Sequence, residues 1–275
     1  MIALYWERLR RHSLALTGLL ILIALAIGAA IGPVVCRQSP TVQHLTERLQ
    51  PPSARHWMGT DDLGRDVFAR MLVGARVSLA VGFIAVAVAV SIGTVLGLCA
   101  GFFGGWWDIL IMRAVDVMLS IPTIFLLLAV LAFLNPSIYN VMAVIGWTAW
   151  PSLARLVRGE CLSIREREYI LAARIAGIPS ARILGVHLLP NVAAPILVSA
   201  TLGVGGAILT ESALSFLGLG VQPPMASWGT ILAVGRDYLH IAWWLSVFPT
   251  LAILITVMAF NFLGEGLRDV LDPRL

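Results

Sequence analysis

The sequence contains no lysine. All 19 of its basic residues are arginine, and with 15 acidic residues they give a formal net charge of +4. A P-loop nucleotidase needs the lysine of its phosphate-binding loop, and a Schiff-base enzyme needs a lysine amine. The absence of lysine therefore excludes a P-loop ATPase site and pyridoxal-phosphate chemistry in this chain.

Residues for metal binding and covalent catalysis are also scarce. The three cysteines, Cys36, Cys99 and Cys161, lie far apart and form no C-x-x-C pair, so neither a disulfide framework nor a zinc site is expected. The five histidines are scattered, and neither H-E-x-x-H nor G-x-S-x-G occurs. We expect a protein without enzymatic activity of its own, without a cofactor or bound metal, and without a nucleic-acid partner.

Charge is sparse and apolar residues dominate. Hydrophobic residues make up 59% of the chain and charged residues 12%, with a mean hydropathy of +0.90. A soluble domain is about half apolar and about a quarter charged, whereas a membrane-spanning helix needs roughly 20 mostly apolar residues. The sequence predicts an all-α integral membrane protein with six transmembrane helices. The six stretches are Ser13–Val35 and residues 77–103, 109–134, 138–157, 192–217 and 241–264.

The first stretch is predicted to be a retained anchor. It is longer than the roughly 7–15 residues of a signal-peptide core, and its end, Gly32-Pro33-Val34-Val35-Cys36, does not resemble a cleavage site. A polar loop, residues 37–76, follows it. We therefore divide the chain into an anchor helix with its periplasmic loop, residues 1–76, and a membrane core, residues 77–275, with membrane lipid around both.

The distribution of arginine predicts the orientation. Cytoplasmic segments of membrane proteins carry an excess of basic residues. With the N-terminus inside, eleven arginines lie on the cytoplasmic side and seven on the other side. We expect both termini in the cytoplasm, together with a loop at residues 158–190.

Residues 165–179 of that loop predict a short helix. Gly177 suits the position after the last helical residue, and Pro179 stops the helix. Leu171, Ala172, Ile175 and Ala176 recur at helical spacing and form a small apolar face. Such a face either docks into a groove of a partner protein or rests on lipid headgroups.

Charged residues within the spans are costly and face protein or water. Glu211, in the fifth span, either lines a translocation path or is held by hydrogen bonds between helices. Arg113 and Asp116 are three residues apart on one helix face, so we expect a structural ion pair.

Three further features of the sequence bear on structure, and two of them also allow a functional interpretation. Thr60 precedes three aspartates and predicts a helix cap, or a surface for a binding protein. The pairs Trp106-Trp107 and Trp243-Trp244 are typical of an aromatic belt at the membrane interface. Small residues at 203, 205 and 206 suit close helix packing or open space for a substrate.

The cytoplasmic loop resembles a known motif. Ala172-Ala173, Gly177 and Leu189-Pro190 match the loop E-A-A, three residues, Gly, nine residues, Ile-x-Leu-Pro of bacterial ABC importer permeases. The sequence departs from it at two positions, with Leu171 in place of Glu and His187 in place of Ile. Glu168, one turn earlier, is the acidic residue that could take over the role of the family Glu.

Other segments resemble the dipeptide/oligopeptide/nickel group of these permeases, and within it the second, or C-type, subunit. They occur in the order typical of that group and cover nearly the whole chain. They are G-T-D-D-L-G-R-D at 59–66, G-F-F-G-G at 101–105, S-F-L-G-L-G-V-Q-P-P at 215–224, W-G at 228–229, A-F-N at 259–261, G-L-R-D at 266–269 and L-D-P at 271–273.

The resemblance implies a multi-pass subunit of the bacterial inner membrane with a type I importer core of five helices plus the anchor helix. It implies a heterodimer with a second permease, two ATP-binding subunits, and a periplasmic or lipid-anchored substrate-binding protein. The implied substrates are dipeptides or oligopeptides, with nickel or a metal chelate as the alternative. A stand-alone carrier or channel is less expected, because the repeated halves common in carriers are missing. The residues implied in ATPase coupling are Glu168, Leu171, Ala172, Ala173, Gly177, Leu189 and Pro190.

Overall fold

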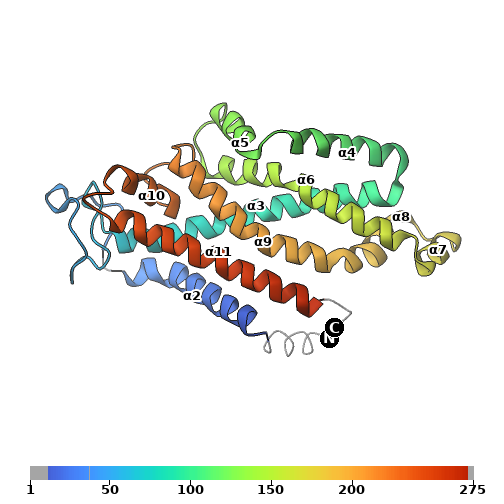
Figure 1. The fold of residues 1–275 in the computed structure, drawn as a ribbon, viewed down its shortest axis with the longest axis horizontal. Coiled ribbons are helices and arrows are strands. Elements are labelled where there is room, and N and C mark those ends of the chain that lie inside the picture. The colour runs from blue at the N-terminus through green and yellow to red at the C-terminus, as the bar shows by residue number, and fades with distance from the viewer. Residues whose placement is uncertain (1–11, 37, 272–275) are drawn as a thin grey trace.

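The computed structural model describes residues 12–36 and 38–271, and every named element in this part of the chain is helical. The long helices α2, α3, α6, α9 and α11 run side by side along the long axis of the molecule, and α4 and α5 lie beside α6 (Figure 1). The 38–66 loop lies at one end, called here the loop end. The short helix α7 lies at the opposite end, called the α7 end. The bounds are α2 Ser13–Val35, η1 Leu45–Glu47, α3 Val67–Phe103, α4 Gly105–Ser120, α5 Thr123–Ala132, α6 Ile138–Arg165, α7 Glu168–Ile175, α8 Ser180–Arg182, η2 Ile183–Leu188, α9 Leu189–Phe216, α10 Trp228–Asp237 and α11 Trp244–Leu271.

Four helical segments in the described residues are long and apolar enough to cross a membrane. They comprise α2, α3, the continuous segment formed by α8, η2 and α9, and α11. The first expected helix, Ser13–Val35, is confirmed with the same bounds. The second begins ten residues before the expected residue 77, because the Asp66 carboxylate accepts a hydrogen bond from the Ala69 N–H at 2.8 Å and caps the helix at Val67. The expected division at residue 76 therefore falls inside α3.

The third expected span is not one straight helix. It is divided into α4 and α5, which are bent by 89° relative to each other. Pro122 lacks the N–H that an α-helix needs, and a residue before proline avoids the helical region. Ile121 is accordingly extended, with φ −97° and ψ 126°. Counting this bent pair as one span raises the number of apolar spans to five.

The fourth expected span, residues 138–157, is the first part of α6. This helix continues to Arg165 and carries four charged residues in its last eleven positions. It is not among the apolar spans of the described residues. The described structure thus supports four or five apolar spans rather than the expected six.

Glycines let α6 lie close against α3. Gly93, Gly97 and Gly101 are spaced by four residues and form one stripe on α3. A Cβ atom added at Gly97 would lie 2.6 Å from the Ala154 carbonyl oxygen, and one at Gly101 would lie 2.6 Å from the Cys161 Cβ. This seam is the small-residue packing typical of membrane helices.

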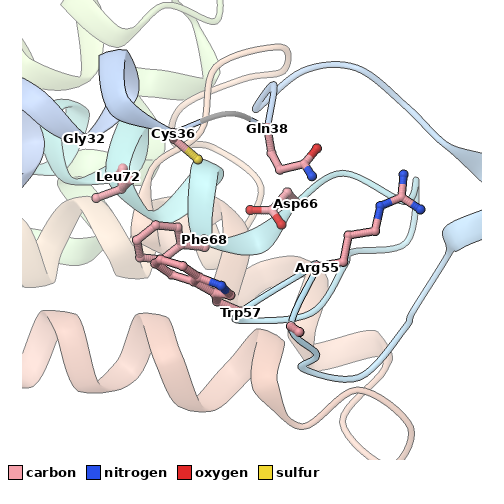
Figure 2. A pocket seen from close by; sticks show the side chains of 9 residues that line it. Gly32, Cys36, Gln38, Arg55, Trp57, Asp66, Phe68 and Leu72 are labelled. Carbon is pink, nitrogen blue, oxygen red and sulfur yellow. The ribbon is translucent and has the colours of Figure 1, made fainter.

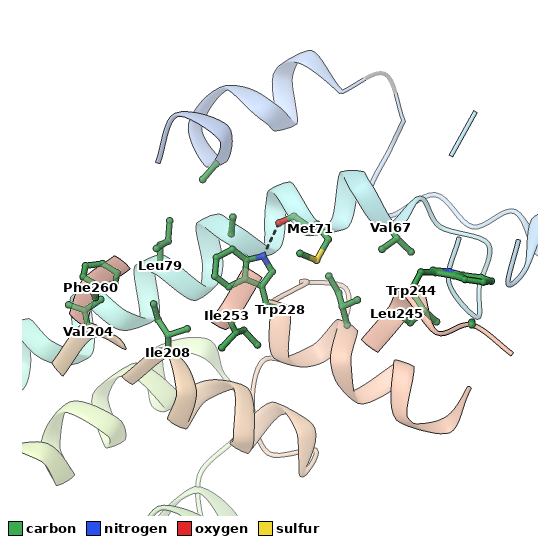
Figure 3. Close-up of a cluster of buried hydrophobic side chains, with 14 residues drawn as sticks. Val67, Met71, Leu79, Val204, Ile208, Trp228, Trp244, Leu245, Ile253 and Phe260 are labelled. Atoms are coloured by element: carbon green, nitrogen blue, oxygen red, sulfur yellow. Dashed lines mark hydrogen bonds between the residues drawn. The ribbon is translucent and has the colours of Figure 1, made fainter. Parts of the chain in front are cut away.

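The largest apolar cluster joins α3, α9, α10 and α11 near the loop end (Figure 3). Trp228 is buried at its centre, and its indole Nε1–H donates to the Met71 carbonyl oxygen at 3.1 Å. Burial of the ring together with a satisfied N–H fixes α10 on α3.

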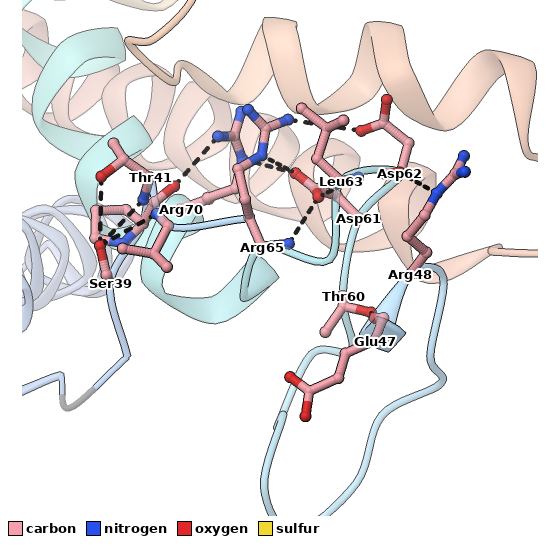
Figure 4. A network of polar contacts seen from close by, with 12 residues as sticks. Ser39, Thr41, Glu47, Arg48, Thr60, Asp61, Asp62, Leu63, Arg65 and Arg70 are labelled. Atoms are coloured by element: carbon pink, nitrogen blue, oxygen red, sulfur yellow. Dashed lines mark hydrogen bonds and ion pairs between the residues drawn. The ribbon is translucent and has the colours of Figure 1, made fainter. Parts of the chain in front are cut away.

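Buried charges fold the 38–66 loop into a compact structure at the loop end. The Asp61 carboxylate accepts from Arg65 Nε at 2.7 Å and lies 3.3 Å from Arg70 Nε (Figure 4). The expected helix cap at Thr60 is wrong, because the Thr60 hydroxyl bonds the Glu47 carbonyl and the Gln50 N–H instead. Asp61 is thus bonded inside the loop, and the helix begins only at Val67, with Asp66 rather than Thr60 as its cap.

Candidate functional site: the α7 surface and a cavity between the spans

The helix α7 is held on the rest of the chain by two residues of one face. The side chains of Ile170 and Ala173 are buried, Ile170 completely, in a cluster that includes Val157 and Leu188. Because these anchors point inward, the opposite side of a helix of only eight residues must point away from the molecule.

That opposite side is the apolar face predicted from the sequence. Leu171 is 45% exposed and Ile175 88% exposed, and Ala172 and Ala176 are also exposed. An exposed isoleucine on a short helix leaves apolar area uncovered in this chain. The predicted face exists and is accessible.

The predicted end of this helix is confirmed. Gly177 has φ +72°, a conformation that costs glycine little. Its N–H donates to the Arg174 carbonyl at 3.0 Å, and the Ile178 N–H donates to the Ala173 carbonyl at 3.1 Å. These two bonds form a Schellman motif, which fixes where α7 stops.

The remaining residues of the loop motif lie around α7 and at the start of α9. Glu168 is exposed in the first turn of α7, where a carboxylate opposes the positive end of the helix dipole. Leu189 and Pro190 are exposed at the beginning of α9, directly after the π-helix η2. Pro190 has no N–H to donate, and so the regular bonding pattern of an α-helix is interrupted beside it.

A cavity of about 350 Å³ opens between α3, α5, α6 and α9. Its walls are alanine, glycine, aliphatic and hydroxyl side chains, and none of the lining residues is charged. No motif in the sequence indicates this cavity, since its walls come from segments more than 100 residues apart. The hydroxyl-bearing lining residues are Thr123, Thr148, Ser152, Ser199 and Thr210.

The three glycines of α9 divide between packing and open space. Gly203 and Gly206 line the cavity, and a Cβ atom added at Gly206 would meet nothing within 4 Å. Gly205 faces α11, where an added Cβ would lie 3.4 Å from Val257. Close packing and open space are therefore both present, at different positions.

Glu211 is completely buried between helices and is not among the residues that line the cavity. Its carboxylate accepts hydrogen bonds from Ser215 at 2.6 Å, Ser227 at 2.7 Å and Ser78 at 3.4 Å. These hydroxyls belong to α9, to the N-cap of α10 and to α3. Of the two roles expected for Glu211, this geometry favours the bond between helices over the translocation path.

The expected ion pair between Arg113 and Asp116 is wrong. The Asp116 carboxylate pairs with Arg155 of α6 at 2.6 Å, and Arg113 is exposed without an ion pair in the described residues. A neighbouring helix supplies the better-placed guanidinium, which spacing along one helix does not reveal.

One of the four tryptophans expected at the membrane interface has another role. Trp106, Trp107 and Trp243 are exposed, but Trp244 is only 3% exposed. Its Nε1–H donates to the Thr60 carbonyl oxygen at 3.1 Å and fixes the 38–66 loop on α11.

A second cavity, of about 540 Å³, lies at the loop end between α2, the start of α3 and the 38–66 loop (Figure 2). The rings of Trp57 and Phe68 lie in its wall, 5.1 Å apart. The Asp66 carboxylate on this wall is already engaged by the Ala69 N–H and by His56 Nδ1 at 2.9 Å. Both oxygens of the acidic group in this cavity are therefore used in bonds that stabilise the fold.

Residues 93–275, which include α7 and most of the uncharged cavity, match the family model of the binding-protein-dependent transport system inner membrane component. The chain belongs to this family. Residues 1–52 match the N-terminal transmembrane domain of oligopeptide transport permease C. The resemblance found in the sequence is confirmed, and the chain is a multi-pass inner-membrane permease.

Relatives of this permease align over almost its full length. The dipeptide transport system permease protein DppC of Alkalihalophilus pseudofirmus is 46% identical, covering 98% of this chain and 89% of that protein. The probable D,D-dipeptide transport system permease protein DdpC of Escherichia coli is 42% identical, covering 97% and 89%. The glutathione transport system permease protein GsiD of Pectobacterium atrosepticum is 42% identical, covering 98% and 90%.

Proposed function

We propose that this permease is one of two membrane subunits of an ATP-driven importer of dipeptides or short oligopeptides. The observation that carries the proposal is the exposed apolar face of α7. Leu171 and Ile175 leave apolar area at one end of a membrane protein, and a groove on a partner covers such a helix face well.

The partner at this face is an ATP-binding subunit, and two such subunits hydrolyse the ATP. Glu168, Leu171, Ala172, Gly177, Leu189 and Pro190 form the coupling surface, within the loop at residues 158–190. Ala173, which the resemblance also implied, is buried and anchors α7 beneath this surface. The permease itself has no lysine and hence no P-loop. Its own contribution is a two-state assembly of helices whose equilibrium the ATP-binding subunits shift.

The uncharged cavity is this chain's half of the translocation path, and a second permease supplies the other half. Hydroxyl groups such as those of Ser152 and Ser199, which make no side-chain hydrogen bond in the described residues, can bond the backbone of a peptide, while alanine and glycine leave room for varied side chains. The absence of charge in the cavity favours passage over tight binding. Selection then falls to a periplasmic or lipid-anchored binding protein.

The membrane topology follows from this arrangement. The proposed six crossings are α2, α3, the bent pair α4 and α5, α6, α9 and α11, with both termini and α7 in the cytoplasm. The arginine distribution supports this orientation. The anchor and its loop precede the five-helix core, whose first helix is α3.

The peptide substrate is favoured over nickel or a metal chelate. The relatives above are named for dipeptides and glutathione. In the described residues no group of three or more His, Cys, Asp or Glu side chains is placed to hold a metal ion. A stand-alone carrier would leave the exposed face of α7 unexplained.

The test is purification of the tagged chain from native membranes, followed by identification of the proteins that accompany it. We expect a second permease and two ATP-binding subunits. Replacing Ala172 by arginine should retain membrane insertion but lose the ATP-binding subunits and dipeptide uptake, while Ala172→Ser should keep both. Recovery of the wild-type chain alone in mild detergent, or normal uptake by Ala172→Arg, would refute the proposal.

A further inference from the structure

The α7 end of α3 is held by arginines from other segments. Arg165, the last residue of α6, donates from Nη1 to the Gly101 carbonyl oxygen at 2.8 Å. Arg174, in the last turn of α7, donates from Nη2 to the Phe102 carbonyl oxygen at 3.5 Å. Both acceptors lie in the segment 101–105, where α3 ends and α4 begins.

These bonds satisfy groups that an α-helix leaves unpaired. The last four carbonyls of a helix have no partner within it. The Gly104 N–H reaches only the Ala100 carbonyl, at 3.1 Å. The next two oxygens, of Gly101 and Phe102, are bonded by guanidinium groups, whose positive charge also suits the negative end of the helix dipole.

Arg174 makes a second contact with the same residue. Its Cζ atom lies 4.4 Å from the centre of the Phe102 ring, the geometry of a cation–π interaction. Phe102 is buried in the same cluster as Ile170 and Ala173, the two anchors of α7. The helix α7 is thus attached to α3 through Phe102, while its face with Leu171 and Ile175 stays exposed.

The neighbouring pair completes the attachment on the side of α4. Arg158 of α6 bonds Asp108 in the first turn of α4, with Nε 3.0 Å from Oδ1 and Nη2 2.5 Å from Oδ2. A forked pair of this kind fixes direction as well as distance. It joins α6 to α4 independently of α7. In the described residues, the side-chain hydrogen bond between α7 and α3 comes from Arg174.

We propose that Arg174 is a positioning residue for transport: it passes displacements of α7 through Phe102 to α3, one of the helices that line the uncharged cavity. This inference rests on the proposed function of α7 as the coupling helix. Without Arg174, α7 would keep its apolar contacts with Phe102, α6 and η2 but would lose its hydrogen bond to α3, so a displacement of α7 would move α3 less.

The attachment can be measured in the chain alone. Spin labels at Ile175→Cys and Trp106→Cys, both exposed positions, report the distance between α7 and the start of α4 in nanodiscs, with the three native cysteines replaced by alanine. We expect a broader distance distribution for Arg174→Gln than for the unsubstituted background. The matched control is Arg182→Gln, an exposed arginine of the same loop without a side-chain hydrogen bond or ion pair in the described residues. An unchanged distribution in Arg174→Gln overturns the proposal.

The consequence for transport is measured in the purified complex, reconstituted with its binding protein and supplied with alanyl-alanine. The number of ATP molecules hydrolysed per dipeptide imported should rise about tenfold for Arg174→Gln. A tenfold factor is within the usual range of coupling between two sites of a protein. It should rise less for Arg174→Lys, which keeps the charge but loses the planar fork, and should be unchanged for Arg182→Gln.

Two outcomes in the complex would overturn the inference. One is an unchanged ratio in Arg174→Gln. The other is loss of the ATP-binding subunits from that variant, because Arg174 would then act in docking. If the wild-type complex imports no dipeptide, the proposed function fails, whereas the spin-label distances still decide whether Arg174 holds α7 on α3.

Discussion

Arg76 of α3 donates from Nε to the carbonyl oxygen of Ala29 in α2, at 2.5 Å. Its Nη2 reaches the next carbonyl, of Ala30, at 2.7 Å. Pro33 explains why an acceptor is free there, since a proline cannot donate to the carbonyl four residues earlier. A charged side chain within a membrane helix is thus used to satisfy a defect in the neighbouring anchor helix.

Replacing Arg76 by methionine should loosen the anchor. The Ala29 carbonyl would lose its partner in an apolar environment, which costs about 1–3 kcal/mol. We expect a lower thermal unfolding midpoint in detergent and faster proteolysis between α2 and α3. Arg76→Lys should retain part of the stability, because an ammonium group still reaches one carbonyl, and equal stability of the methionine variant would contradict the role given to this bond.

The glycine seam predicts a sharp dependence on side-chain size. Gly97→Leu would place a side chain where even a Cβ atom lies 2.6 Å from backbone oxygen, so α3 and α6 must separate. We expect the free energy of unfolding to fall by about 3 kcal/mol or more, or the protein to fail to fold, since overpacking typically costs about 1–3 kcal/mol of stability even where neighbours can adjust.

Gly159→Ala is the control for that variant. It lies within α6, and an added Cβ there meets nothing within 4 Å. This substitution should raise stability by about 0.5–1 kcal/mol, because alanine is the better helix former. Thermal unfolding followed by tryptophan fluorescence would distinguish the two, and a stable Gly97→Leu protein would show that the seam is not tight.

Glu211 is predicted to act on stability rather than on substrate choice. Glu211→Leu would remove the common acceptor of Ser78, Ser215 and Ser227, leaving buried hydroxyls at a cost of about 1–3 kcal/mol. Glu211→Gln keeps the shape and one acceptor oxygen and should lose less. Competition between dipeptides for uptake should be unchanged in the glutamine variant. An altered preference among dipeptides would show that Glu211 lines the translocation path.

The cavity offers a variant that separates transport from folding. Gly206→Val should be tolerated by the fold, because a Cβ atom there has open space, and the added side chain would project into the cavity. We expect dipeptide uptake to fall while the unfolding midpoint and the recovery of partner subunits stay close to wild type. Uptake at the wild-type rate would mean that the substrate passes elsewhere.

The sequence predicted the elements whose signal is local. The bounds of α2 follow from an uninterrupted apolar run, and the end of α7 follows from Gly177 and Pro179, whose backbone preferences act at their own positions. The same locality explains one miss. Arg70 and Arg76 lower the hydropathy of the first ten residues of α3, so the sequence did not predict them as part of the span. Both side chains are in fact bonded within the chain.

Features that need two distant segments were not predictable. Asp116 pairs with Arg155 rather than Arg113 because α6 lies against α4, and Trp244 is buried because the 38–66 loop folds onto α11. The cavity likewise exists only once α3, α5, α6 and α9 are assembled. The bend at Pro122 did have a local signal, but the apolar residues on both sides concealed it.

The 37 residues of α3 form an unbroken helix from the buried charges of the 38–66 loop to the arginines at its other end. At 1.5 Å per residue such a rod is about 55 Å long, well beyond the roughly 30 Å of a bilayer's hydrocarbon core. Treated as a lever pivoting at one end, it would swing its far end by about 5 Å for a tilt of about 5°. A displacement at one face of the membrane would then change the structure at the other face through the rigid helix itself, with no ion or water taking part.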